Sequence, residues 1–394
     1  MSPTEVVLCA PVRTPIGGFN GTLKDTPATD LGAAVIRETL RRSGLQADHV
    51  DTVLMGQVVQ AGARMNPARQ ATLGAGLPVQ VPALTLNRVC GSGAQAIASA
   101  AMEVLAGQSR VAIAGGMENM DQAPYLAPSA RWGQRMGDAA LLDSLLRDGL
   151  NDAFSGQHSG WHTEDLATRY GVTREDQDRW AARSQQRFSA AQAAGRFAEE
   201  IVALDLPGRK GPVRFDKDEA NRPDTTVQAL ARLKPAFRQD GTITAGNAPG
   251  LNSGAAALVV AERGFAEAQG LQPWARLVSH AVVAVEPGLF GIGPVPAVRA
   301  ALARARWQLT DVDRIEINEA FAAVTLACLR QLELPEDIVN VEGGAIAHGH
   351  AIGATGAVLT TRLLHAMRRD GLRRGIVTLC IGGGQGIALA LEAL

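Results

Sequence analysis

Short apolar runs alternate with amphipathic segments along the first 120 residues of the chain. Apolar runs bounded by turn residues predict strands at 6–10, 52–55, 83–86 and 111–114. Apolar residues at helical spacing predict helices at 30–42 and 93–106. Because strands and helices alternate, we expect a mainly parallel sheet with helices on both faces. The pair Gly115 and Gly116 is expected to end the last of these strands.

Residues 121–247 have a different character, with denser charges and more frequent Pro and Gly. One amphipathic helix is predicted at 175–192, where Trp180, Ser184 and Phe188 stand at four-residue spacing. Residues 207–247 lack sustained periodicity, which is typical of a large insertion that carries binding loops.

The α/β pattern returns after about residue 250 and weakly repeats the first part. Strands are predicted at 255–260, 315–317 and 376–379, and helices at 320–332 and 357–369. In each half, a strand leads into an Ala-rich helix and a later strand ends in glycines. We therefore expect a duplicated fold. Its N-terminal half spans 1–120 and is completed by about 248–272, the inserted loop domain spans 121–247, and the C-terminal half spans 273–394.

Composition and charge exclude several functional classes. The formal net charge is -1 and aromatic residues are 4%, so nothing supports binding to nucleic acid or to an anionic membrane. Charge-free stretches such as 242–261 are interrupted by Gly, Asn, Pro and Ser, so no membrane span is expected. The four cysteines show no C-x-x-C spacing, so zinc ribbons are not indicated and a reducing cytoplasm is expected. The 43 glycines, about 11% of the chain, follow no collagen-like period.

Cys90 stands where a predicted strand ends and an Ala-rich helix begins, between Val89 and Gly91. A thiol at this junction meets the positive end of the helix dipole and free N–H groups, both of which favour the thiolate. The same N–H groups could hold an oxyanion that forms when the sulfur attacks a carbonyl. The alternative is a small buried hydrophobic residue, which is the commonest fate of a lone cysteine.

Two further segments are rich in glycine. His348 and His350 lie in the segment 343–356, where a histidine could act as a base or as an oxyanion donor. The alternatives are a packed loop or a His-x-His metal pair, although no carboxylate or thiol stands at customary ligand spacing. Cys380 precedes Gly382–Gly384 at the end of a predicted strand and is either a site residue or a buried thiol. Asn318 on its own indicates a helix N-cap, and we assign Cys9 and Cys328 to the core.

Taken together, these segments resemble the thiolases, the acetyl-CoA acetyltransferase and 3-ketoacyl-CoA thiolase group. The resemblance covers nearly the whole chain and rests on the segments 12–17, 87–93, 115–125, 244–248, 291–297, 318–322, 343–356 and 380–386. It implies two similar five-stranded α/β halves in a five-layered αβαβα stack, with a loop domain inserted in the first half. It also implies a homodimer or homotetramer that holds no metal and no bound cofactor and uses coenzyme A as a substrate.

The resemblance assigns a role to each candidate residue. Cys90 would be the nucleophile that carries the acyl group, and Cys380 the acid/base at the substrate α-carbon. His350 would activate Cys90 and, with a water held by Asn318, stabilise the enolate oxygen of the second acyl-CoA. The N–H groups of Cys90 and Gly382 would form the other oxyanion hole. The reaction implied is reversible cleavage of a 3-ketoacyl-CoA by coenzyme A, in acyl-CoA and fatty acid metabolism.

The resemblance also implies a set of binding residues. His158 would line the acyl pocket, Arg222 and the stretch Ala245–Gly250 would contact coenzyme A, and Phe237 and Phe321 would pack around its pantetheine arm.

Several neighbours depart from the family pattern. Ser159 and Phe290 replace methionines, Pro249 replaces a serine, Trp161 replaces a smaller residue, and Glu342, His348 and Ala351 are also atypical. We therefore expect an acyl preference shifted away from acetoacetyl-CoA, in a direction that the sequence does not give. Two other functions remain open: a decarboxylative ketosynthase-type condensing enzyme, and a non-catalytic acyl-CoA-binding protein on the same fold.

Overall fold

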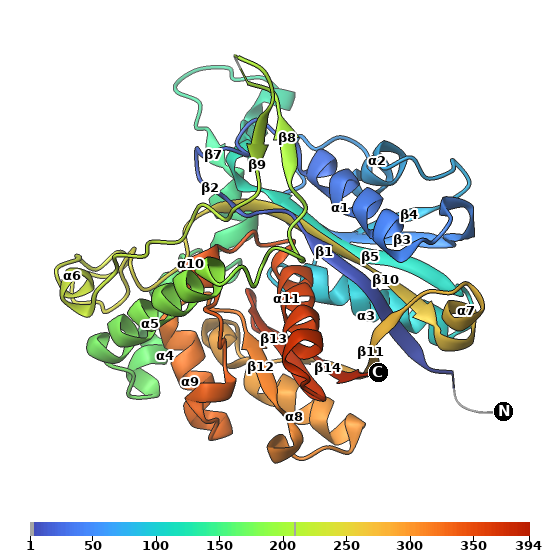
Figure 1. Cartoon of the computed structure of the whole chain (residues 1–394). Coiled ribbons are helices and arrows are strands. Elements are labelled where there is room, and N and C mark those ends of the chain that lie inside the picture. Colours follow the sequence, from blue (N-terminus) through green and yellow to red (C-terminus); the bar gives the residue numbers. More distant parts are fainter. Residues whose placement is uncertain (1–3, 209) are drawn as a thin grey trace.

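A ten-stranded mixed sheet crosses the computed structural model, which describes residues 4–208 and 210–394 (Figure 1). Its strand order is β12-β13-β14-β11-β1-β10-β5-β3-β4, and the short β2 (Gly17–Gly18) pairs with β10. The strands of the N-terminal half are β1 (Val6–Arg13), β10 (Asn252–Glu262), β5 (Val111–Asn119), β3 (Thr52–Gly56) and β4 (Ala83–Leu86). Those of the C-terminal half are β11 (Pro273–Ala284), β14 (Gln385–Ala393), β13 (Arg374–Ile381) and β12 (Arg314–Ile317).

The two halves of the sheet repeat one strand order. The antiparallel pair β1–β11 lies where the two halves meet. Outward from this pair, β10, β5 and β3 on one side correspond to β14, β13 and β12 on the other, and β4 follows β3 at the edge. The repeat extends to the outer position, where Val339 forms a parallel bridge to Ile315 in the place that β4 occupies in the first half. This topology confirms the expected duplicated fold.

The expectation of a mainly parallel sheet is wrong. In the described part of the chain, the parallel pairs between these strands are β3–β4, β3–β5 and β12–β13, and the other pairs are antiparallel. The reason is visible at β13 and β14, which a tight turn at Gly382–Gly384 connects into a hairpin without a helical crossover.

Helices form three layers around the two halves of the sheet (Figure 1). Helices α3 (Ser92–Leu105) and α11 (Thr355–Asp370) pack against each other in the middle layer. Helices α1 (Ala28–Ser43) and α2 (Pro67–Gly74) cover the outer face of the first half, and α8 (Pro294–Ala305) and α9 (Ala322–Leu332) cover that of the second. The result is the five-layered αβαβα stack. The two middle helices can approach closely because α3 has a glycine, Gly93, where it meets α11. A Cβ on Gly93 would lie 2.6 Å from the backbone nitrogen of Ala357.

Gly115 and Gly116 do not end their strand, contrary to the sequence prediction. β5 continues to Asn119 and pairs with β10 along its whole length. A Cβ on Gly116 would lie 2.2 Å from the carbonyl oxygen of Gly353. The glycine therefore permits the loop that carries His350 to lie directly against the sheet.

The segment between β5 and β10 contains more regular structure than its sequence predicts. The predicted helix is α5 (Arg174–Ala193), which begins with a capping box formed by Thr173 and Asp176. The other strands and α-helices of the segment are β6 (Tyr125–Leu126), β7 (Leu142–Asp143), α4 (Ser159–Arg169), β8 (Leu204–Leu206), β9 (Val213–Phe215) and α6 (Val227–Ala231). Two further short α-helices are α7 (Arg263–Ala268) and α10 (Ala345–His348). Among the described residues, no helix is long and apolar enough to cross a membrane.

Candidate active site

Cys90 lies on a strained turn between β4 and α3. Val89, which precedes it, has a φ of +44°, an unusual conformation for a β-branched residue. The side chain of Asn87 accepts a hydrogen bond of 2.8 Å from the Val89 N–H. The Ser92 hydroxyl accepts from the Arg88 N–H at 2.8 Å and donates to the Val89 carbonyl at 2.7 Å. These local bonds hold the turn that presents the thiol.

The surroundings of Cys90 contradict the expectation of a stabilised thiolate. Burial raises the pKa of the Cys90 thiol to about 11. The N–H groups of Gly382 and of Cys90 itself hydrogen-bond to the sulfur and lower the pKa, but by less than burial raises it. The resting group is therefore a neutral thiol that needs a base. The same two N–H groups are the ones expected to hold an oxyanion.

His350 is fixed at its backbone and at both ring nitrogens. Its N–H donates to Oδ1 of Asn252 at 2.8 Å, and its Nδ1 lies 2.7 Å from Oγ1 of Thr355. Its Nε2 lies 3.4 Å from Nδ2 of Asn318. Burial lowers the pKa of His350 to about 4, so the imidazole is neutral at pH 7 and can accept a proton.

Asn318 is not a helix N-cap, because α9 begins four residues later, at Ala322. Its side chain is fully buried, and among the described residues its Oδ1 has no hydrogen-bond partner. A buried, unpaired amide oxygen beside His350 is a suitable place for an ordered water.

The buried carboxyl group of Glu118 links the loop after β3 to the loop that carries His350. It accepts hydrogen bonds from the N–H groups of Val58 and Gly353, both at 2.9 Å, and from that of Val59 at 3.3 Å. Burial raises its pKa to about 8, against the opposite effect of these three N–H groups. Glu118 thus ties the loop after β3 to the loop that carries His350.

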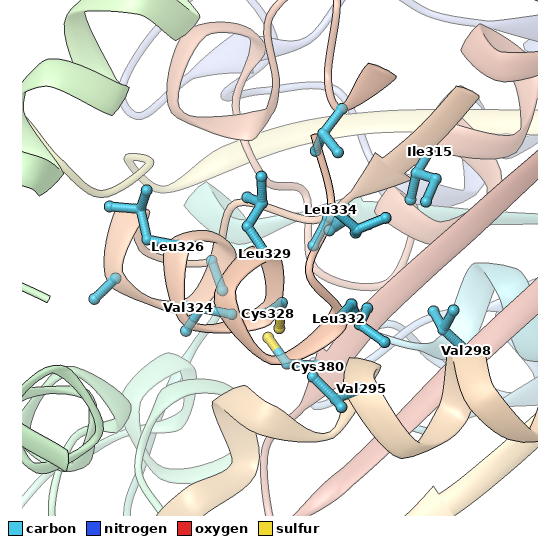
Figure 2. Close-up of a cluster of buried hydrophobic side chains, with 14 of the residues drawn as sticks. Val295, Val298, Ile315, Val324, Leu326, Cys328, Leu329, Leu332, Leu334 and Cys380 are labelled. Carbon is cyan, nitrogen blue, oxygen red and sulfur yellow. The ribbon is translucent and has the colours of Figure 1, made fainter. Parts of the chain in front are cut away.

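Cys380 lies in the apolar core behind the site, where Figure 2 shows it beside Cys328 and Val295. Its thiol is fully buried and does not line the cavity described next. Burial, followed by the neighbouring thiols of Cys90 and Cys328, raises its pKa well above the usual value. Cys380 is therefore a protonated thiol close to Cys90, as a proton donor to carbon requires. Cys9 and Cys328 are buried in the core, as expected.

A cavity of about 220 Å³ opens at Cys90. The predicted site residues that line it are Cys90, His158, Phe237, Pro249, Phe290, Phe321, His350 and Gly382. Arg222 and Ala245 lie outside its lining, at the surface of the protein. The structure thus brings the residues expected to be the nucleophile, the base and the oxyanion donors, Cys90, His350 and Gly382, to a single, mostly apolar cavity.

Aromatic rings form one wall of this cavity. The rings of His158 and Phe237 stack with their centroids 4.6 Å apart, and Phe321 meets Phe237 edge-on at 6.0 Å. Ser159 also lines the cavity, but its hydroxyl is already engaged in donating to the carbonyl of Leu150 at 2.6 Å.

Sequence reasoning missed several residues of the site. Met120, Leu150 and Ile352 line the cavity, but single apolar residues outside a periodic pattern carry no distinguishing signal in the sequence. Glu118 and Thr355 act through contacts between distant segments, which no local pattern encodes. Across residues 4–208 and 210–394, no group of three or more His, Cys, Asp or Glu side chains converges as a metal site.

A cysteine thiol, a neutral histidine and two backbone N–H donors at one cavity fit an enzyme of the acyl-transfer class. The comparisons with known proteins give the family. Residues 6–264 match the model of the thiolase N-terminal domain, and residues 271–393 that of the thiolase C-terminal domain. The chain therefore belongs to the thiolase family.

Curated relatives and solved structures agree with this assignment. The chain is 54% identical to an acetyl-CoA acetyltransferase of Pseudomonas aeruginosa, over 98% of this chain and 99% of the relative. It is 50% identical to one of Cupriavidus necator, over 99% of both chains. The crystal structure of the Bacillus anthracis acetyl-CoA acetyltransferase, 44% identical, superposes with a TM-score of 0.97 and covers 99% of both chains.

Proposed function

We propose that the protein is an acyl-CoA:acetyl-CoA C-acyltransferase, which reversibly cleaves a 3-ketoacyl-CoA with coenzyme A. The observation that carries this proposal is the meeting of Cys90, His350 and Gly382 at one cavity, with the Cys380 thiol close behind Cys90. The relatives named acetyl-CoA acetyltransferase support the same reaction.

In the first step, the sulfur of Cys90 bonds to the carbonyl carbon at position 3 of the substrate, and its proton passes to His350. The oxygen becomes an oxyanion that the N–H groups of Cys90 and Gly382 stabilise. The bond between carbons 2 and 3 then breaks, which leaves an acyl group on Cys90 and the enolate of acetyl-CoA.

The second proton transfer occurs at carbon. The Cys380 thiol gives its proton to the enolate, and acetyl-CoA leaves. The thiol of coenzyme A then attacks the carbonyl carbon of the acyl-enzyme and gives its proton to the Cys380 thiolate. The Cys90 sulfur leaves and takes its proton back from His350, which restores both thiols and the neutral imidazole. The protonated state of the buried Cys380 thiol supports its role as the acid in this direction. No bound cofactor is needed for these steps, and coenzyme A takes part as a substrate.

The preference for a particular acyl chain is a separate proposal. Phe290 and Ser159 both line the cavity, and Pro249 has no N–H to donate to a pantetheine arm. We expect these residues to shift the preference away from acetoacetyl-CoA. A panel of straight, branched and aromatic 3-ketoacyl-CoA esters tests this, and a clear preference for acetoacetyl-CoA would contradict it. Arg222 and Ala245 stay as proposed contacts of coenzyme A outside the cavity.

Steady-state cleavage of the same panel, measured by loss of the 3-ketoacyl-CoA absorbance, tests the proposed function itself. The proposal fails if no ester is cleaved in the presence of coenzyme A. Turnover of malonyl but not acetyl thioesters would favour the ketosynthase-type alternative, against which the buried Cys380 argues. Binding without turnover would favour the non-catalytic alternative.

We further propose a homodimer or homotetramer, on the basis of exposed structural features. β4 lies at the edge of the sheet with Leu84 49% exposed, and an unpaired edge strand favours pairing with another copy. Trp132 and Met136 are 83% and 91% exposed on the segment between β6 and β7. We also propose a cytoplasmic location and a role in fatty acid metabolism. We propose further that residues 121–247 form a loop domain inserted in the N-terminal half.

A further inference from the structure

A threonine outside the catalytic set contacts the base of the site. Thr355, the first residue of α11, is 1% exposed. Its Oγ1 lies 2.7 Å from Nδ1 of His350 and 2.8 Å from the carbonyl oxygen of Ala351. A carbonyl oxygen can only accept, so the single hydroxyl hydrogen of Thr355 is donated to Ala351.

The hydroxyl oxygen therefore has only lone pairs to offer the imidazole. Nδ1 of His350 must carry a hydrogen and donate it to Thr355. Because the imidazole is neutral at pH 7, this is its only N–H, and Nε2 carries a lone pair. Nε2 is the nitrogen that lies beside Asn318.

We propose that Thr355 is a positioning residue that fixes His350 in the Nδ1–H tautomer, so that Nε2 carries the lone pair that takes the proton of Cys90. The reaction it serves rests on the proposed function, whereas the tautomer is a property of the free protein. When the sulfur bonds to the acyl carbon, its hydrogen moves to Nε2, and Thr355 then accepts a charge-assisted hydrogen bond from the imidazolium. Thr355 itself touches no reacting atom.

His158, the other histidine of the cavity, provides an internal reference because the opposite tautomer is expected for its ring. Nδ1 of His158 accepts a hydrogen bond of 3.0 Å from the N–H of Gly160, so this nitrogen carries a lone pair. Burial lowers the pKa of His158, so a neutral ring with its hydrogen on Nε2 is expected at pH 8. The two rings are therefore expected to differ in tautomer within one protein.

Nitrogen NMR of the uniformly labelled, intact protein tests the tautomer directly, because the chain has only seven histidines. Signals of His350 and His158 are assigned by their loss in His350→Ala and His158→Ala. We expect a protonated Nδ1 and an unprotonated Nε2 for His350, and the reverse for His158, at pH 8. A protonated Nε2 in the free His350 overturns the proposal, whether or not the protein turns over any substrate.

Kinetics of matched variants test the consequence. Thr355→Val removes the hydroxyl with little change in shape, and Thr355→Ser retains it. Thr360→Val is the control, because buried Thr360 lies in the same helix and donates likewise at 2.8 Å to the carbonyl of Gly356. We expect Thr355→Val to lower kcat about 10–100-fold with little change in KM. The serine variant should restore most of this rate.

A structural role of Thr355 would give a different pattern. Equal losses of kcat in Thr355→Val and Thr360→Val would overturn the proposal, as would a serine variant no better than valine. If Thr355→Val does not fold, the NMR result on the wild-type protein decides. If no variant, including the wild type, cleaves any 3-ketoacyl-CoA, the proposed function fails while the tautomer of His350 still stands or falls on the NMR result.

Discussion

Nδ2 of Asn318 lies 3.4 Å from Nε2 of His350, and both side chains are buried. This contact joins the loop before α9 to the loop before α11. It also leaves Oδ1 of Asn318 unpaired among the described residues, next to the base. The two side chains therefore place polar atoms next to a mostly apolar cavity.

We predict that Asn318→Ala lowers kcat for condensation by about 10²–10³-fold, the usual effect of removing one oxyanion donor, because the water that Asn318 would hold is lost with it. The rate at which iodoacetamide alkylates Cys90 should change much less, because Cys90 and His350 both remain in place. Steady-state condensation rates and alkylation rates, measured on the same preparations, provide the comparison. Parallel losses in both would show that Asn318 acts on Cys90 instead.

The pH dependence of Cys90 reactivity should reveal a neutral thiol and imidazole. With the pKa of Cys90 raised to about 11 and that of His350 lowered to about 4, neither group is charged at pH 7. The rate of iodoacetamide alkylation should therefore keep rising with pH through pH 9, because the thiolate fraction keeps growing. A plateau with a midpoint below pH 8 would instead indicate a thiolate–imidazolium pair.

His348 should reduce the stability of the protein. It is 1% exposed, and neither ring nitrogen has a hydrogen-bond partner among the described residues. We expect His348→Leu to raise the free energy of unfolding by about 1–3 kcal/mol at pH 7.5. Urea unfolding at fixed protein concentration measures this. His365→Leu is the control, because Nε2 of His365 donates to the carbonyl of Pro11 at 3.0 Å and this variant loses a bond.

The gain from His348→Leu should grow as the pH falls. Burial, with Arg362 and Arg13 adding to it, holds the pKa of His348 well below its usual value. The unfolded chain binds a proton below about pH 6.5 that the folded chain does not, so wild-type stability is lost there. At pH 5.5 the variant should gain about 1.4 kcal/mol more than at pH 7.5. An equal gain at both pH values would contradict a depressed pKa.

Gly116→Ala should disrupt the contact between the sheet and the His350 loop. Its Cβ would lie 2.2 Å from the carbonyl oxygen of Gly353, so β5 or the loop must move. We expect a destabilisation of more than about 2 kcal/mol in urea unfolding. Gly18→Ala is the matched control, because its Cβ meets no atom closer than 3.8 Å. Similar unfolding midpoints for the two variants would contradict this account of Gly116.

Much of the site was predictable because its chemistry is local in sequence. Cys90, His350 and Gly382 each stand in a glycine-rich turn after a strand or before a helix, and the structure brings all three to one cavity. The duplicated fold was predictable from the repeated order of strands, helices and glycine turns. The residues that line the aromatic wall came from the family resemblance rather than from periodicity.

The rest depends on contacts between distant segments. Glu118 and Gly353 are 235 residues apart, and a buried Glu at the end of a strand looks like any other polar residue in the sequence. The prediction of mainly parallel strands was wrong because apolar runs do not distinguish parallel from antiparallel pairing. β13 and β14, for example, form an antiparallel hairpin. The pKa of Cys90 was mispredicted because local N–H groups were visible in the sequence, whereas the burial that outweighs them was not.

Trapping the acyl-enzyme tests the central claim most directly. Wild type, Cys90→Ala and Cys380→Ser are incubated with radiolabelled acetyl-CoA, quenched in acid, and mapped by peptide mass spectrometry. We predict stoichiometric acetyl on Cys90 in the wild type, none in Cys90→Ala, and near wild-type acylation in Cys380→Ser, which should then fail to condense or cleave. Label on another residue, or equal loss of acylation in both cysteine variants, would contradict the account.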